Sequence, residues 1–480
     1  MAKSYQNCLT RGASRRKVNE KFVHIREQKR GVLMESTENG SSLNLNIDRR
    51  TLLKSVGVAG LASAPLLNSG MMSAAEAAGQ TINFTAWEYQ PDTIKSLVAN
   101  WSKKSKNKVN ISFIPNVGYT AGIQARQRGG KPADVFYNFA YNSQKFVNQK
   151  WAADLRGLPG AEKMVAEMFP SARSRFVAEN GAIVSAPYFS AVHMLQYNKK
   201  MVAAAGFNST PNSLQETYDQ CKKIKANGVD SPYVAYWVKD FVEEYLHVYL
   251  LAGNVQPFDN KGNPIFMDDP KTLDVLNWWQ AMYKDGMTPK SVLTDDPGKH
   301  TSSMANGQAA FYALHHYFLR DIVESKGPSS GDIAQAKIVG TGGKTLQMGE
   351  VIQMGGKVTG AKKAAAWDFM KTYGYKDASG EFTTFQKWAA SGALCAPYPG
   401  FFTDPKVVKA FPSYMDLSLI KDTFQTASDI VPARTLPWYQ GFQAQCGTII
   451  HDLLLGNSNA RATANALAIA CKTAKSGSGL

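Results

Sequence analysis

The most restrictive feature of the sequence is an alternation of strand-like and helix-like segments. Apolar residues recur at every second position in 81–86 and again in 109–113, which is the period of a half-buried strand. Between them, four apolar residues from Ile94 to Trp101 follow the spacing of an amphipathic helix. The apolar run 133–136 predicts a third strand. Strand, helix and strand in succession predict a parallel sheet with crossover helices, and therefore an α/β fold.

The same alternation continues to the end of the chain. One helical stripe starts after Asp269-Pro270 and ends at Gly286, and two further stripes end at Gly374 and Gly456. No repeat of fixed period interrupts the pattern, which disfavours a structural or adhesive surface protein. A chain of 480 residues is long enough for an export leader and two lobes of ordinary domain size.

Composition narrows the function classes. The chain is 44% hydrophobic and 19% charged, which is typical of a globular protein. Its net charge of +16 comes partly from residues 1–77, and no dense Lys/Arg run follows residue 108, so we expect no nucleic-acid partner. The five cysteines form no CxxC pair and the seven histidines no HExxH motif, so we expect neither a cofactor nor a metal.

The N-terminal part contains three export features in the expected order. Twin arginines lie in Asp48–Lys54, a short apolar stretch covers 55–67, and an A-x-A signal ends at Ala77. Together they resemble a twin-arginine signal peptide cleaved near Ala77, which predicts a periplasmic protein. Met34 is an alternative start that would leave a conventional leader, and the sequence does not decide between Met1 and Met34.

A series of short landmarks along the chain carries a family resemblance. They are Trp87–Tyr89, Pro132–Phe136, Ala186–Lys199, Pro211–Tyr218, a helix over Met304–Phe311, a helix over Ala364–Phe369, and Pro437-Trp438 followed by a closing helical hairpin to Ala470. In this order they resemble the family of extracellular solute-binding proteins whose best-known members bind maltose and other sugars. One landmark departs from the family, because Pro211–Tyr218 lacks the tryptophan that usually occurs there.

The resemblance implies a two-lobed periplasmic-binding-protein fold of type II. Each lobe would hold a mainly parallel sheet flanked by helices, with a ligand cleft between the lobes. The expected division is an extension and signal in 1–77, a first lobe of 78–188 plus 350–400, a second lobe of 189–349 plus 401–475, and a disordered tail in 476–480.

The resemblance also implies a function without catalysis. We expect the substrate-binding component of an ABC importer, a monomer that closes on a small solute, a sugar above all, and delivers it to a membrane permease. Three alternatives keep the fold and change the ligand to a polyamine, a polyol phosphate or a metal. A periplasmic enzyme is a weaker alternative, because no nucleophile, acid pair or cofactor motif is found.

Sugar binding needs aromatic faces against the ring and polar groups for the hydroxyls, because an unpaired buried polar group is costly. Residues of these types in expected loops or at element ends are the candidate ligand contacts. They are Trp87, Glu88, Tyr89, Tyr119, Asn138, Tyr141, Tyr188, Trp237, Tyr317, Arg434 and Trp438. Asp134 is a further candidate that serves equally well as a cap of backbone amides.

Three other patterns invite specific chemistry. If His315-His316 lies on a helix, the side chains point about 100° apart and do not readily share one ion, so we expect no metal there. The glycine-rich segment 340–345 lacks the first glycine of a Walker loop and predicts a turn between lobes. Cys446 and Cys471 flank the turn of the closing hairpin at similar heights, which predicts a disulfide in an oxidising periplasm.

Overall fold

The computed structural model describes residues 79–115, 118–259, 261–340, 342–427 and 431–477. The twin-arginine segment and the expected cleavage site lie outside these residues. Among the described residues, no helix is both long and apolar enough to cross a bilayer.

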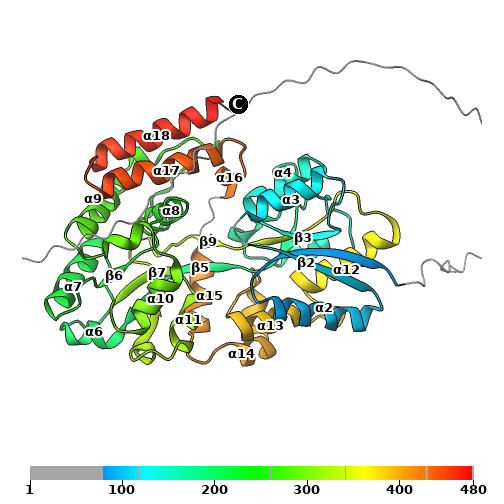
Figure 1. Cartoon of the computed structure of the whole chain (residues 1–480), viewed down its shortest axis with the longest axis horizontal. Helices are drawn as coiled ribbons and strands as arrows, with labels where there is room; N and C mark the ends of the chain where they lie inside the picture. The colour runs from blue at the N-terminus through cyan, green and yellow to red at the C-terminus, as the bar shows by residue number, and fades with distance from the viewer. Residues whose placement is uncertain (1–78, 116–117, 260, 341, 428–430, 478–480) are drawn as a thin grey trace, which may run out of the picture. The chain divides into compact units, whose positions relative to one another are not determined.

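The first lobe is built on a five-stranded sheet of order β2-β1-β3-β10-β4. Strands β2 and β3 of this sheet are labelled in Figure 1. Its strands are β1 (Thr81–Trp87), β2 (Lys108–Ile114), β3 (Val135–Asn138), β4 (Ala186–Pro187) and β10 (Val351–Met354). Strand β1 pairs in parallel with β2 and β3, whereas β10 pairs antiparallel with β3 and β4. The three strands expected from the alternation at the start of the chain are therefore confirmed.

The second lobe is built on a sheet of order β6-β7-β5-β8, with β9 also paired to β5. Its strands are β5 (Ala191–Asn198), β6 (Tyr233–Val234), β7 (Phe311–His315), β8 (Ile333–Ala336) and β9 (Gln347–Met348). Only β6 and β7 are parallel, and β5 runs antiparallel to β7, β8 and β9. The expectation of a mainly parallel sheet is wrong here, because the central strand β5 enters directly from the first lobe, opposite in direction to β7.

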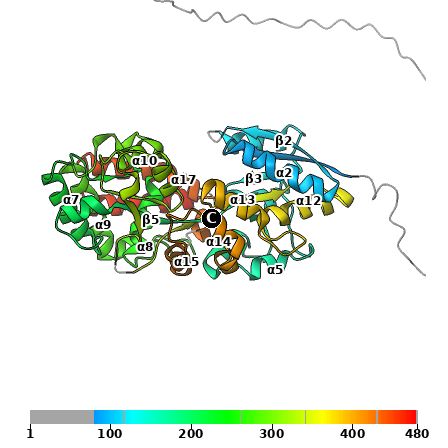
Figure 2. The same ribbon diagram turned by 90° about the horizontal axis from the view of Figure 1, so that it is seen from below.

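Helices surround both sheets (Figures 1 and 2). The α-helices are α2 (Pro91–Ser105), α3 (Tyr119–Arg128), α4 (Ser143–Asn148), α5 (Ala161–Ala166), α6 (Lys199–Ala204), α7 (Leu214–Ala226), α8 (Val242–Ala252), α9 (Pro270–Lys284), α10 (Pro297–Ala305), α11 (Phe318–Glu324), α12 (Gly360–Gly374), α13 (Thr383–Gly392), α14 (Pro405–Ala410), α15 (Leu417–Thr426), α16 (Val431–Arg434), α17 (Tyr439–Leu454) and α18 (Ala460–Gly477). Among the short 3-10 helices, η1 (Ala140–Asn142) and η2 (Pro170–Arg175) both contact α16.

The helices follow the sequence pattern closely, with one exception. The stripe that begins at Pro270 is helix α9, and the stripe that ends at Gly374 is helix α12. The closing hairpin is α17 and α18. The segment expected as one helix over Met304–Phe311 is instead the end of α10, a turn, and the start of β7. Gly307 in this turn has φ of 71°, a left-handed conformation that ends the helix at no steric cost for glycine.

The chain passes between the two sheets more than once, and hydrogen bonds hold these crossings together. The Ser190 N–H donates to the carbonyl of Cys395 at 2.7 Å, which joins the first crossing to the segment after α13. The Arg175 guanidinium donates to the carbonyls of Gln347, and of Gly349 at 2.9 Å, in the second crossing. Because Arg175 is only 4% exposed, this clamp is internal to the junction.

A close backbone approach on α17 gives a stability prediction. A Cβ added at Gly447 would lie 2.2 Å from the carbonyl oxygen of Lys239, an approach that a backbone atom cannot relieve cheaply. We expect Gly447→Ala to lower the free energy of unfolding by about 1–3 kcal/mol, measured by urea unfolding. Gly441→Ala on the same helix is the control, because its added Cβ would meet Ala474 at an ordinary 3.5 Å. An equal loss in both variants would contradict the steric explanation.

Candidate ligand-binding site between the lobes

A group of charged side chains lies buried where the two lobes meet. Glu243 and Glu244 occupy the first turn of α8, and Arg434 is the last residue of α16. Arg434 Nη2 lies 2.8 Å from Glu243 Oε2, and Arg434 Nη1 lies 3.5 Å from Glu244 Oε2. The side chain of Arg434 is 12% exposed and that of Glu243 is fully buried. Two carboxylates therefore share one guanidinium, and these three side chains together carry one net negative charge.

Two histidines extend this group on the side of the second sheet. His193 on β5 and His315 at the end of β7 are directly paired across the two antiparallel strands. Their Nε2 atoms lie 3.1 Å and 3.3 Å from the same oxygen, Glu244 Oε1. We name the five residues His193, Glu243, Glu244, His315 and Arg434 the interlobe cluster.

Further buried groups hold Glu243 in place. Its Oε1 accepts a hydrogen bond from the Tyr439 hydroxyl at the start of α17. The same oxygen lies 2.8 Å from His247 Nε2, one turn further along α8. Because α8 is buried along its whole length, these partners are needed to offset the cost of burying its charges.

Burial and pairing set the protonation of the cluster. Burial alone would raise the pKa of Glu243, but Arg434 and His247 lower that pKa to about 2. Burial likewise opposes ionisation of Glu244, yet the close contacts of its carboxylate with His193 and His315, at 3.1 Å and 3.3 Å, hold its pKa well below the usual value. Burial, together with His193, lowers the pKa of His315 to about 4. At neutral pH the carboxylates are thus ionised and the His315 imidazole is neutral.

The first lobe faces the interlobe cluster through η1, which follows the carboxyl end of β3. The charges of Glu243, Glu244 and Arg434 all act on the half-buried Tyr141 in η1, whose pKa is raised first by burial and then by Glu350. The Ala140 N–H donates to Glu350 Oε2 at 2.8 Å. A direct contact between the lobes follows, in which Gln440 Nε2 donates to Asn142 Oδ1 at 3.3 Å.

Glu350 differs from the two acids of α8. It lies in the crossing between β9 and β10, and burial raises its pKa to about 8 despite the hydrogen bond from Ala140 and the charges of Arg175 and Arg434. This carboxyl is therefore mostly protonated at neutral pH, and it offers a hydroxyl donor to the site where Glu244 offers an acceptor.

Several buried polar atoms around the cluster have no hydrogen-bond partner among the described residues. They include His315 Nδ1, Arg434 Nε, the Tyr245 hydroxyl and Gln347 Nε2. Native structures satisfy most buried polar groups, so these unpaired atoms beside the buried charges are available to hydrogen-bond a polar ligand.

Of the candidate ligand contacts, Tyr141, Tyr317 and Arg434 lie at or beside the interlobe cluster. The Tyr317 ring stacks on His315 with a centroid distance of 5.4 Å and an interplanar angle of 2°. The Tyr141 ring stacks on Phe139 at 5.5 Å, and Phe139 belongs to a group of aromatic residues in the first lobe that also includes Trp87.

Trp87, Tyr119 and Tyr188 belong to this aromatic group and are all buried. The Trp87 ring lies 5.1 Å from Tyr119 and 5.5 Å from Tyr188, and it stacks on Phe139 at 5.4 Å. The Tyr119 hydroxyl donates to the carbonyls of Thr85 and Tyr137, so its polar atom is already occupied. These rings support the wall that ends in Tyr141.

The other five candidates have different surroundings. Glu88 is exposed at the end of β1, and the half-buried Tyr89 stacks on Trp388 at 6.1 Å. Asn138 is buried and donates to Gln353 Oε1 at 2.7 Å. Trp237 packs on Trp279 in the core of the second lobe, and Trp438 packs on Phe258 at the start of α17. Asp134 accepts from the Asn83 N–H at 2.8 Å, which is the backbone-capping alternative.

The candidate ligand contacts predicted from the sequence do not include His193, Glu243, Glu244 or Glu350. A usable signal was present for two of them, because Glu243 and Glu244 interrupt the apolar segment that becomes α8, and buried charges require partners. His193 and Glu350 carry no such local signal, since their neighbours come from distant parts of the chain.

The histidine pair needs a correction. His315-His316 is not helical, because His315 ends β7, and successive strand residues point to opposite faces. His315 faces His193 and Glu244, whereas His316 Nε2 lies 3.2 Å from Cys395 Sγ. The two histidines do not meet at one point, which agrees with the expectation, but strand geometry and not helix geometry separates them.

The expected disulfide also needs a correction. Cys446 and Cys471 are free, buried thiols on α17 and α18. Burial and then the charge of Glu243 raise the pKa of Cys446, whereas the charges beside Cys471 are those of Lys472 and Lys475. The thiols thus face different surroundings, although their helices pack together.

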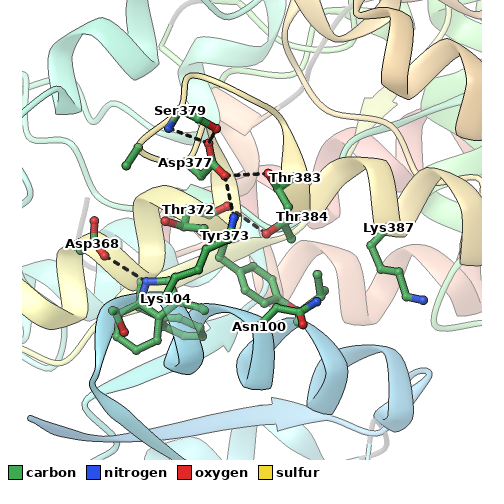
Figure 3. Close-up of a pocket in the computed structure, with 15 residues that line it drawn as sticks. Asn100, Lys104, Asp368, Thr372, Tyr373, Asp377, Ser379, Thr383, Thr384 and Lys387 are labelled. Carbon is green, nitrogen blue, oxygen red and sulfur yellow. Dashed lines mark hydrogen bonds and ion pairs between the residues drawn. The ribbon is translucent and has the colours of Figure 1, made fainter. Parts of the chain in front are cut away.

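Two surface pockets lie elsewhere. One, of about 310 Å³, lies between α2, α12 and the segment before α13 (Figure 3), and the other, of about 600 Å³, is lined by residues of α7, α8 and α9. In the first pocket Lys104 lies 3.4 Å from Asp377, and Trp101 donates to Asp368 at 3.0 Å. The polar groups of this pocket pair with one another, whereas several polar atoms of the interlobe cluster have no hydrogen-bond partner among the residues that the structure describes. We therefore favour the interlobe cluster as the ligand-binding site.

Two lobes that share a polar site near the carboxyl ends of β3 and β7 have the architecture of a two-lobed binding protein. Residues 87–378, well over half of the chain, match the family described as bacterial extracellular solute-binding protein. The chain belongs to this family, whose members bind substrates and are not enzymes, and this confirms the resemblance seen in the sequence. No curated protein matches the chain in sequence.

Several solved structures share the fold. Maltose-bound MalE3 of T. maritima superposes with a TM-score of 0.69 at 18% identity, covering 82% of this chain and 100% of that one. A solute-binding protein of Thermotoga Lettingae TMO bound with alpha-D-tagatose gives 0.68 at 16% identity, covering 82% and 100%. One from Agrobacterium vitis S4 with bound D-mannitol gives 0.66 at 15% identity, covering 84% and 99%. At these identities the likeness establishes the two-lobed α/β fold alone.

Proposed function

We propose that the protein captures a sugar or polyol between its lobes and delivers it to the membrane permease of an ABC importer. The observation that carries this proposal is the interlobe cluster, where unpaired polar atoms adjoin aromatic rings in a member of the solute-binding family. The solved structures of the same fold that hold maltose, tagatose and mannitol support the choice of ligand class.

The chemistry of the cluster suits a polyhydroxy ligand. Ionised Glu244 accepts hydrogen bonds from hydroxyl groups, while Arg434 and protonated Glu350 donate them. The rings of Tyr141 and Tyr317 offer apolar faces to the C–H groups of the ligand. Groups from both lobes would touch the same molecule, so the ligand would favour the closed arrangement of the lobes.

We further propose the cellular context. The twin-arginine motif and the A-x-A signal support export to the periplasm with cleavage near Ala77. We expect the exported protein to act as a monomer, without a nucleic-acid partner and without catalysing a reaction on its ligand.

A thermal-shift screen with isothermal titration tests the ligand class. Maltose, D-tagatose, D-mannitol and a uronate represent the proposed class, and spermidine, a polyol phosphate and a divalent metal ion represent the alternatives. A true ligand stabilises the folded protein by about 2.7 kcal/mol at one hundred times its dissociation constant. Stabilisation only by the alternatives, or conversion of a sugar to product, would contradict the proposal.

A matched pair of variants tests the location of the site. We expect Tyr141→Ala to weaken binding of the solute at least tenfold, because it removes the aromatic wall of the first lobe, a contact of about 1.4 kcal/mol or more. Tyr218→Ala is the control, since Tyr218 lines the separate pocket at α7 and α9. Equal weakening by both variants would place the solute elsewhere.

A further inference from the structure

Three side chains of the interlobe cluster converge on one point. His193 Nε2, His315 Nε2 and Glu244 Oε1 all lie within 4.8 Å of one another, and the two imidazole rings have centroids 4.1 Å apart. Ligand atoms around a tetrahedral zinc ion, each bonded at about 2.0–2.2 Å, are roughly 3.4 Å apart. The two contacts of 3.1 Å and 3.3 Å to Glu244 are close to this spacing without any rearrangement of the backbone.

The scaffold beneath these three residues is rigid. His193 and His315 are partners in the β5–β7 ladder, so their side chains project from the same face of the sheet. Glu244 lies in the first turn of α8, whose residues are buried along its whole length. A site built on two paired strands and a packed helix is held more precisely than one built on loops.

The nitrogens of the two histidines are poorly satisfied. His193 is fully buried and His315 is 9% exposed, yet His193 Nε2 and both ring nitrogens of His315 have no hydrogen bond of good geometry within the described part of the chain. His193 Nδ1 lies 3.4 Å from the carbonyl of Leu346, and a proton on Nδ1 directed at this oxygen leaves the Nε2 lone pair available to a metal.

Glu244 offers a carboxylate to a cation, although two buried guanidiniums lie near it. Arg434 is shared between Glu243 and Glu244, and the charge of Arg175 lowers the pKa of His315. Two imidazoles and one carboxylate are a ligand set that zinc and similar divalent transition metals prefer, with a fourth position left for water or substrate.

We propose that His193, Glu244 and His315 form a binding site for one divalent transition-metal ion of the zinc type. The fourth coordination position faces the junction of the lobes, where a hydroxyl of the solute or a water completes the shell. The site goes beyond the proposed capture of a sugar or polyol, and it does not depend on the identity of that solute.

Titration of the untagged, chelator-treated protein with Zn²⁺ tests the proposal. We expect one ion to bind per chain by calorimetry, with a rise in melting temperature as Zn²⁺ increases. Co²⁺ at the same site should give the strong visible absorption of a tetrahedral N/O environment. Absence of Zn²⁺ binding by the wild-type protein would overturn the proposal, whatever the variants do.

Variants locate the ion. His315→Gln and His193→Gln should each weaken Zn²⁺ binding at least one-hundredfold and abolish the Co²⁺ absorption, because each removes a ligand. His300→Gln is the control, since His300 is also buried but lies on α10 outside the cluster. If one ligand variant fails to fold by circular dichroism, the other serves, and undiminished binding in a folded ligand variant overturns the assignment.

The outcome is separable from the proposed function. Solute binding is measured on the chelator-treated protein and again with Zn²⁺ bound. Solute binding without any metal binding rejects the metal site alone, whereas metal binding without binding of any polyhydroxy solute rejects the proposed ligand class alone.

Discussion

Arg434→Met is expected to lower the free energy of unfolding by about 3–5 kcal/mol, because it leaves two buried carboxylates without their counter-charge. Glu243 is fully buried and lies 2.8 Å from the guanidinium, and Glu244 lies 3.5 Å from it. Methionine keeps much of the apolar volume of the side chain, so the loss reports charge rather than packing. Urea unfolding followed by circular dichroism measures it.

Two controls define the cause of this loss. Arg320→Met removes an ion pair of the same 2.8 Å length to Glu324, but the two side chains are 24% and 46% exposed, so we expect a change below about 1 kcal/mol. The double variant Arg434→Met with Glu243→Gln should recover part of the stability, because one of the uncompensated charges is gone. A loss in Arg434→Met no larger than in Arg320→Met would show that the buried pairing is not stabilising.

Glu350→Gln is expected to stabilise the protein at alkaline pH and to have little effect near pH 5. In the folded protein the pKa of Glu350 is raised from its usual value near 4.5 to about 8. Between these values the folded protein retains a proton that the unfolded chain releases, so stability falls as the pH rises and levels off above about 8. Glutamine cannot ionise and keeps an oxygen for the Ala140 N–H, so it escapes this loss.

The size of the effect follows from how far the pKa of Glu350 is raised. A pKa difference of one between the folded and unfolded states corresponds to about 1.4 kcal/mol. After allowance for the partial exposure of the residue, the variant should exceed the wild type by on the order of 2–4 kcal/mol at alkaline pH.

The measurement is urea unfolding across the range from acidic to alkaline pH, on chelator-treated protein without solute. Glu88→Gln at an exposed site is the control, and its curve should follow the wild type. Parallel curves for Glu350→Gln and wild type would show that Glu350 is ionised in the folded protein.

Much of the fold was predictable because local periodicity reports which side of an element is buried. The spacing of apolar residues located β1, α2, β2 and β3, and proline and glycine marked the ends of α9 and α12. The order of loose landmarks indicated the family, which the match over residues 87–378 confirms. Where the pattern was ambiguous it failed, as at Gly307, where a turn between α10 and β7 looked like the interior of one helix.

The candidate site was predictable only in part. Aromatic residues such as Tyr141 and Tyr317 were found by residue type at the ends of elements, but the same criterion selected Trp237, which packs in a core. Residue type alone does not distinguish a ring that faces a ligand from one that faces other rings. That distinction depends on which elements pack against each other.

The sequence by itself determined the positions of most elements and with them the α/β class, because each element depends on neighbours within a few residues along the chain; the order of short landmarks along the chain indicated the family. Only the tertiary structure decided that the second sheet is largely antiparallel and that His193, Glu244, His315 and Arg434 meet at the junction of the lobes. Contacts between residues far apart along the chain leave no periodic trace in the sequence; they arise from strand register and lobe packing, which bring distant charges into one low-dielectric site.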